Sequence, residues 1–261
     1  MLYTIQAFVI TLLLGSFTFA GSKVFITEIT DPQNSSDAGR YIELYNSDGE
    51  DCDWSSRDGG IALIRWTNGN ADYTASSLKY LAPDDTTAYN GIPAYGFYIV
   101  CNNADKFAET WPGLTCDQDI GTGGAADSNG DDNIALVHAI PEGATNFVDE
   151  ILDMFGVPGE DGSGTGHEFE DGRAERAAGV TEGTPQWNEA EWNIDNDSGG
   201  GDGNQYAPEG FDPGAWIGAG EQSDICEDDS ACNTGSDGAC EYPDTGYDCD
   251  GNCVGEVDCA G

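Results

Sequence analysis

Six short runs rich in β-branched and aromatic residues recur along this chain, and each is bounded by Gly, Asn, Asp or Pro. They span residues 23–30, 40–46, 61–66, 96–102, 133–138 and 147–154. In the second run Ile42 and Leu44 alternate with Glu43, which is the period of a half-buried strand. The third run (IALIRW) is apolar on both faces and suits a central strand. The pattern predicts an all-β sandwich.

Helical patterning is weak, because Gly or Pro interrupts most windows with apolar residues at helical spacing. Residues 103–111 (NADKFAETW) are the exception, with Phe107 and Trp111 four apart on one face. Residues 156–220 are loop-like, and their tryptophans are expected to hold irregular chain against the sheet. These are Trp187, Trp192 and Trp216.

The N-terminus predicts export. Residues 7–20 (AFVITLLLGSFTFA) form an apolar stretch that ends in small residues, as in a secretory signal peptide cut before Gly21. The segment before it lacks Lys and Arg, which leaves an uncleaved anchor as the alternative, although the stretch is short for a membrane span. We therefore expect three parts: a signal peptide at 1–20, a sandwich domain at 21–220 and an acidic Cys-rich tail at 221–261.

The nine cysteines predict disulfides in an extracellular protein. Cys52, Cys101 and Cys116 lie in the body, and the other six lie in the last 36 residues. A tail of roughly 40 residues cannot bury a sizeable core, so it needs cross-links. Six cysteines allow 15 pairings, among which the sequence does not choose. Cys52 can remain a thiol, pair with the tail or join another chain.

The most informative feature of the composition is its charge, with 49 acidic against 8 basic residues and a formal net charge of −41. Such a field repels nucleic acid and anionic lipid, so neither is an expected partner. Self-repulsion opposes folding unless salt screens it or divalent cations bind. Adaptation to salty water and a dedicated calcium function are the two interpretations.

Several stretches, in order, resemble the lamin-tail domain, an immunoglobulin-like β-sandwich found in nuclear lamins and in secreted proteins of bacteria and algae. The matching stretches, between residues 23 and 218, are VFITEIT, RYIELYN, GIALIRW, GFYIVCNNADKF, SNGDDNIALVH, FVDEILDMFGVPGEDGSGTGHEFEDGRAER and FDPGAWIG. The resemblance implies the sandwich fold, a bridge between Cys101 and Cys116, and no catalytic residues. Secreted members often sit beside nuclease or phosphatase domains, and this chain contains no such neighbour.

Three loops carry the oxygen ligands that calcium prefers. Their candidate ligands are Asp127, Asn129 and Asp131 in the first loop, Asp195, Asp197 and Asp202 in the second, and Asp248 and Asp250 in the tail. The first loop does not fit the EF-hand pattern, and a tight turn at Asn129 and Gly130 into the next strand is the competing interpretation. A solvated glycine-rich loop competes for the second.

Catalytic motifs are missing from the sequence. Two histidines, His138 and His167, cannot supply an HExxH zinc helix, and neither a G-x-S-x-G elbow nor a phosphate-binding P-loop occurs. Asn34 and Asn196 stand in glycosylation sequons. The five tryptophans beyond residue 60 could form a glycan-binding surface or could be buried.

Together these features predict a secreted, non-catalytic module that binds or scaffolds at a cell surface or in an extracellular matrix, with calcium as a stabilising ion. Its partner would be an extracellular protein or glycan. The alternatives are an accessory or fragment of an extracellular nuclease or phosphatase, and a glycan-binding module.

Overall fold

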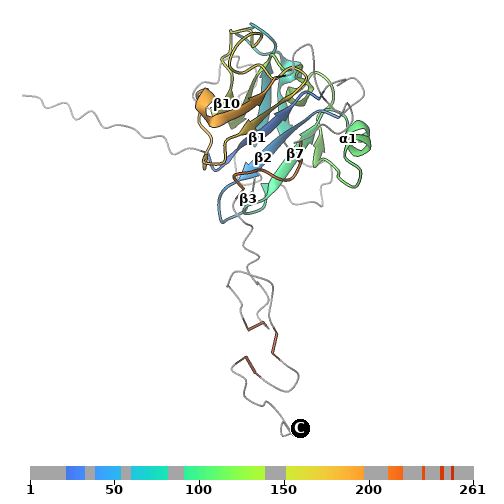
Figure 1. Ribbon diagram of the computed structural model, residues 1–261, viewed down its shortest axis with the longest axis vertical. Coiled ribbons are helices and arrows are strands. Elements are labelled where there is room, and N and C mark those ends of the chain that lie inside the picture. The colour runs from blue at the N-terminus through green and yellow to red at the C-terminus, as the bar shows by residue number, and fades with distance from the viewer. Residues whose placement is uncertain are drawn as a thin grey trace, which may run out of the picture.

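The computed structural model describes residues 22–32, 39–53, 60–81, 91–138, 151–196 and 211–219, together with 231–232, 242–243 and 248–249. The predicted signal peptide, Asn34, Asp197, Asp202 and Asp250 lie outside these residues. Within them, two sheets of mainly antiparallel strands form the body, which confirms the predicted all-β sandwich (Figure 1).

The larger sheet has six strands in the order β12-β11-β1-β2-β7-β8. Their bounds are β1 Val24–Thr30, β2 Tyr41–Asn46, β7 Phe97–Cys101, β8 Gln118–Asp119, β11 Arg173–Arg176 and β12 Trp192–Asp195. All neighbours are antiparallel except β7 and β8, which are parallel. The predicted runs at 23–30, 40–46 and 96–102 are thereby confirmed with small changes at their ends.

The smaller sheet has four strands in the order β10-β9-β4-β5, and a separate pair joins β3 to β6. Their bounds are β3 Cys52–Asp53, β4 Ile61–Trp66, β5 Lys79–Leu81, β6 Gly91–Ile92, β9 Asn133–His138 and β10 Ile151–Phe155. The predicted runs at 61–66 and 133–138 match β4 and β9. The run predicted at 147–154 is observed as β10, and its first residues lie outside the described part.

The main core fills the space between the two sheets. Ile42 and Leu44 of β2 point into it, together with Leu63 of β4 and Leu136 of β9, and none of the four is exposed. Because side chains alternate along a strand, the residues between them point away from this core. In β2 these are Tyr41, Glu43 and Tyr45, and they too are buried. The outer face of the larger sheet is therefore covered by other parts of the chain.

Residues 211–219, which we call the strap, provide part of that cover. Phe211 packs in an aromatic cluster with Tyr41, and Trp216 packs against Tyr45, with ring centroids 5.3 Å apart. The backbone N–H of Gly214 donates to Oε2 of Glu43 over 2.7 Å. In Figure 1 the strap, coloured brown, crosses in front of β2 and β7. The strap is the last part of the body before the Cys-rich tail.

The predicted helix is confirmed as α1, Ala104–Thr110, with Asn103 as its N-cap and Trp111 as its C-cap. The side-chain oxygen of Asn103 accepts from the backbone N–H of Lys106, which satisfies one of the unpaired donors of the first turn. Three single-turn 3-10 helices complete the described elements: η2 Ala75–Ser77, η3 Ala125–Asp127 and η4 Glu189–Glu191.

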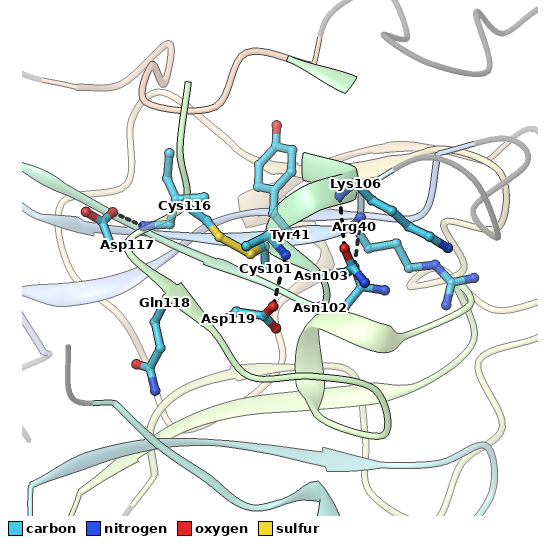
Figure 2. Close-up of a disulfide and its surroundings, with 12 residues drawn as sticks. Arg40, Tyr41, Cys101, Asn102, Asn103, Lys106, Cys116, Asp117, Gln118 and Asp119 are labelled. Atoms are coloured by element: carbon cyan, nitrogen blue, oxygen red, sulfur yellow. Dashed lines mark hydrogen bonds between the residues drawn. A yellow bond between two sulfur atoms is a disulfide. The ribbon is translucent and has the colours of Figure 1, made fainter. Parts of the chain in front are cut away.

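A disulfide joins Cys101 at the end of β7 to Cys116 before β8, as the resemblance implied (Figure 2). The bridge closes the segment that contains α1. Two carboxylates hold the same region, because Asp117 accepts from the backbone N–H of Ile99 and Asp119 accepts from that of Ala104. A second disulfide, Cys232–Cys249, lies in the tail.

The prediction that residues 156–220 are loop-like was wrong at two places, where β11 and β12 form one side of the larger sheet. β11 (RAER) has a single apolar residue, Ala174, which points into the core. Its charged neighbours Arg173 and Glu175 pair with other charges on the outer face, so no apolar alternation marks the strand. Four short strands, β3, β5, β6 and β8, were also not predicted.

Candidate functional site

Asp127, the first residue of the predicted calcium loop, is surrounded by protein donors. One carboxylate oxygen accepts from Asn102 over 3.0 Å and the other from the backbone N–H of Gly123 over 2.8 Å. Its carbonyl oxygen accepts from Arg40 and Arg65 over 3.0 and 2.6 Å. These contacts tie η3 to β4 and to the start of β2. The oxygens of Asp127 therefore accept hydrogen bonds from protein donors, and these bonds hold the loop in place.

Gly130 in the same loop has the turn geometry that the competing interpretation predicted. Its φ is +92°, and a Cβ there would lie 2.3 Å from the Cα of Glu170. Asn129 is exposed and does not have a positive φ. Because the backbone N–H of Phe169 donates to the carbonyl of Gly130 over 2.8 Å, this turn joins the loop to the segment before β11.

Asp131 is the predicted ligand with the most unusual surroundings. Its Oδ2 accepts from the side chain of Asn68 over 2.6 Å, while its Oδ1 is buried without a hydrogen-bond partner. Burial, followed by the charges of Asp132 and Asp161, raises the pKa of Asp131. Asp132 is fully buried and pairs with Arg65 over 3.1 Å. Asp131 and Asp161 thus form an acidic corner with little positive charge nearby.

Two predicted ligands from the other loops fall within the described residues. Asp195 is exposed at the end of β12, and Asp248 is a half-buried residue of the tail. Within the described residues, no three side chains of His, Cys, Asp or Glu gather in an arrangement that could hold a metal ion. A cation at Asp131 would need further oxygens from amide side chains, backbone carbonyls or water, which calcium accepts.

A second acidic site, which the sequence analysis missed, lies under the strap. Glu28 of β1 and Glu43 of β2 are direct partners across the two strands and are 2% and 0% exposed. A register shift between Ile26 and Glu28 turns Thr27 and Glu28 to the same outer face, where Thr27 contacts Glu43. Alternation in β2 did show Glu43 on the face opposite Ile42 and Leu44. It did not show that this face is covered.

Each acid of this pair has its own partners. Oε1 of Glu28 accepts from Arg173 over 2.9 Å, and its Oε2 accepts from the hydroxyl of Tyr41. Oε1 of Glu43 lies 2.7 Å from the hydroxyl of Thr27, and its Oε2 accepts from the backbone N–H of Gly214. Arg173 is the only Arg or Lys that is ion-paired with Glu28 in the described structure, and it also contacts Glu175 and Asp212.

Burial controls the protonation of this pair. It raises the pKa of Glu28 to about 7, although Tyr41 and Arg173 act in the opposite direction. Burial and the neighbouring charge of Glu28 raise the pKa of Glu43 well above its ordinary value. The contacts agree with an ionised Glu28 beside Arg173 and a neutral Glu43. A neutral Glu43 can donate its carboxyl proton to the hydroxyl oxygen of Thr27. That hydroxyl can in turn donate to the backbone carbonyl oxygen of Glu43, which lies 3.4 Å away.

The five tryptophans beyond residue 60, all within the described residues, do not form an exposed binding surface. Trp66, Trp111, Trp192 and Trp216 are each at most 8% exposed. Trp187 is half-buried against the core and lies 4.9 Å from Phe155, measured between ring centroids. These five residues fill the core or hold loops against it, which agrees with the interpretation that they are buried.

His167 is also a packing residue. It is 2% exposed, its Nδ1 lies 2.9 Å from the hydroxyl of Thr165, and its ring packs against Phe155 and Trp187. Burial lowers its pKa, so the ring is neutral at neutral pH. His138, the other histidine, is half-buried at the end of β9.

No protein-family model, curated protein or solved structure matches this chain. The lamin-tail resemblance therefore stays a prediction. Among the helices of the described residues, none has both the length and the apolar character of a membrane span.

Proposed function

We propose that this protein is a secreted, non-catalytic module that binds or scaffolds in an extracellular setting and that divalent cations stabilise it. The lamin-tail resemblance, the signal-peptide pattern and the disulfides support this role. The main support is the distribution of charge. Arg40, Arg65, Arg173 and Arg176 all pair with carboxylates inside the body, and the whole chain has 49 acidic against 8 basic residues.

The acidic corner at Asp131 is a place where a cation would relieve repulsion between carboxylates. Its Oδ1 is buried without a donor, and the charges of Asp132 and Asp161 are close enough to raise its pKa. A calcium ion would supply the missing positive charge and accept oxygen ligands of this kind.

Calcium titration of thermal unfolding tests the cation part of the proposal. We expect the unfolding midpoint of the full chain to rise with millimolar calcium beyond a sodium control of equal ionic strength. Asp131→Asn should remove most of this extra rise. Glu109→Gln, at an exposed acid of α1 that is not a candidate ligand, should leave it unchanged. A midpoint that calcium does not move beyond the sodium control rejects a specific cation role.

A binding screen tests the partner. Glycan and matrix-protein arrays, probed with the full chain with and without calcium, should give binding to a defined component. Parallel assays for nuclease, phosphatase and glycosidase activity with calcium or magnesium present should give none. Turnover in any of these assays would favour the accessory-hydrolase alternative.

A further inference from the structure

The strap covers three buried acids of the larger sheet and adds a fourth, partly exposed acid to them. Glu28 from β1, Glu43 from β2, Glu175 from β11 and Asp212 from the strap meet on the outer face of the larger sheet. Arg173 contacts three of these four acids directly. We call the four acids the carboxyl cluster. If all of them were ionised, one arginine would face four negative charges, and those of Glu28 and Glu43 would be shielded from water.

Among the described residues, the surrounding elements add no further cation. β2 also contributes the neutral Tyr41, and β7 contributes Ile99 and the bridged Cys101. Arg176, the other arginine of β11, pairs with Asp153 and Glu191 instead. The Glu28–Glu43 pair therefore keeps a proton as long as it stays buried, because ionising both acids would bury the charge of Glu43 beside that of Glu28, with which Arg173 pairs.

The strap is bound to this cluster at two points. Gly214 donates its backbone N–H to Glu43, and the carboxylate of Asp212 lies 3.2 Å from Arg173. Two aromatic residues complete the attachment: Phe211 packs near Tyr41, and the indole N–H of Trp216 donates to the carbonyl of Arg176 over 2.6 Å. The side chain of Asp212 is 45% exposed, so this acid can move into water when the strap moves.

We propose that the strap is a proton-controlled latch that stays on the sheet while the Glu28–Glu43 pair holds a proton and lifts away when the pair loses it. Lifting the strap admits water to both carboxylates and carries the charge of Asp212 away from them. The bond from Gly214 to Glu43 strengthens when Glu43 ionises, but one stronger hydrogen bond does not offset a second buried charge next to Glu28, because Arg173 pairs with Glu28.

The direction of the pH effect follows from proton binding. Under the strap the pKa of Glu28 is about 7 and that of Glu43 is raised, whereas both return toward ordinary values once water reaches them. The closed form therefore binds more protons than the open form, and closure weakens as the pH rises through the raised pKa values. Because the strap leads into the Cys-rich tail, opening lengthens the connection between the tail and the body.

Hydrogen–deuterium exchange of the full chain tests the latch. After correction for intrinsic exchange rates, we expect protection of residues 211–219 to fall by about tenfold or more between about pH 5.5 and about pH 8.5. Peptides from β1 and β2 should stay protected at both pH values, which separates latch opening from global unfolding.

Glu43→Gln is the decisive variant. Its amide keeps an oxygen for the N–H of Gly214 and a donor for Thr27, but it cannot ionise. The strap should then remain protected at alkaline pH. Glu28→Gln should do the same and serves as a second variant if the first does not fold. Glu182→Gln, in an exposed pair with Lys23, should behave like the unmodified chain.

Three results overturn the proposal. The first is equal protection of residues 211–219 in the unmodified chain at both pH values. The second is a loss of protection in β1 and β2 that parallels the loss in the strap. The third is a pH response of the folded Glu43→Gln or Glu28→Gln variant that equals that of the unmodified chain.

Discussion

At the scale of the residue, single positions of this protein satisfy a backbone and a packing requirement together. Gly130 has a positive φ, which L-residues with side chains adopt at a cost, and the backbone of Glu170 occupies the space of its missing side chain. Gly113 has a similar φ of +94° but open space around it. Comparing substitutions at the two glycines therefore separates the cost of backbone strain from the cost of the close contact with Glu170.

Gly130→Ala should destabilise the fold by about 2 kcal/mol or more, because it adds a steric clash to the strain of the left-handed backbone. Gly113→Ala should cost about 1 kcal/mol, since it carries the strain alone. Urea unfolding monitored by tryptophan fluorescence measures both values. Equal losses for the two variants would contradict the contact with Glu170.

At the scale of the element, a buried ion pair connects the two sheets. Asp153 of β10 and Arg176 of β11 are 0% and 1% exposed in their side chains and contact each other directly. Asp153 also accepts from the backbone N–H groups of Ile26 and Thr184, and Arg176 donates to the carbonyl of Ile26. The pair thereby fixes the position of β10 relative to β1 and β11.

Asp153→Ala should destabilise the protein by about 3–5 kcal/mol, because Arg176 would be left buried with one remaining acidic partner. The Asp153→Ala/Arg176→Met double variant should lose less than the sum of the two single changes. Chemical denaturation of the four proteins gives this coupling. As a control, Lys23→Ala removes an exposed pair at 3.8 Å and should cost less than about 1 kcal/mol.

The disulfide that closes the α1 segment gives a second prediction at this scale. Replacing Cys101 and Cys116 by Ser should lower the free energy of unfolding by about 3 kcal/mol, as expected for a closed loop of about 15 residues. Replacing Cys232 and Cys249 by Ser should leave the unfolding of the body unchanged. A body equally stable with and without the Cys101–Cys116 bridge would show that β7, β8 and α1 do not depend on it.

At the scale of the whole molecule, the buried acids reverse the dependence of stability on pH that most proteins show. Most proteins lose stability in acid because their carboxylates have lowered pKa values in the folded state. Here burial raises the pKa of Glu28, Glu43, Asp153, Glu175 and Asp212. The folded chain therefore binds more protons than the unfolded chain in the range above the ordinary carboxyl pKa.

We expect the free energy of unfolding to fall as the pH rises from about 4.5 to about 7, at constant ionic strength. The contribution of Glu28, whose pKa moves from 4.5 to about 7, is on the order of 3 kcal/mol. Thermal unfolding across this range measures the slope, and Glu28→Gln should reduce it. A stability that instead increases steadily toward pH 8 would show that these acids are ionised in the folded protein.

The strands of the core were predictable because each joins a strong apolar pattern to turn residues at its ends. Ile42, Leu44 and Leu63 lie in strands of this kind. The helix, with its cap at Asn103, was predictable from the helical spacing of its apolar residues. β11 was not predictable, since its outer side chains are charged and its core side chain is only an alanine. Of the predicted calcium ligands, Asp131 has a buried oxygen without a donor, whereas the carboxylate of Asp127 already has protein donors.

The sequence by itself determined the all-β class, the main strands, the helix and the strongly acidic character, because these depend on local periodicity and composition. Only the tertiary structure decided which acids are buried together. Glu28 and Glu43 lie 15 positions apart in the sequence, and Arg173, Asp212 and Gly214 come from much later segments. Whether a carboxylate is exposed or buried depends on what covers it, and strand pairing and the path of the strap set that cover.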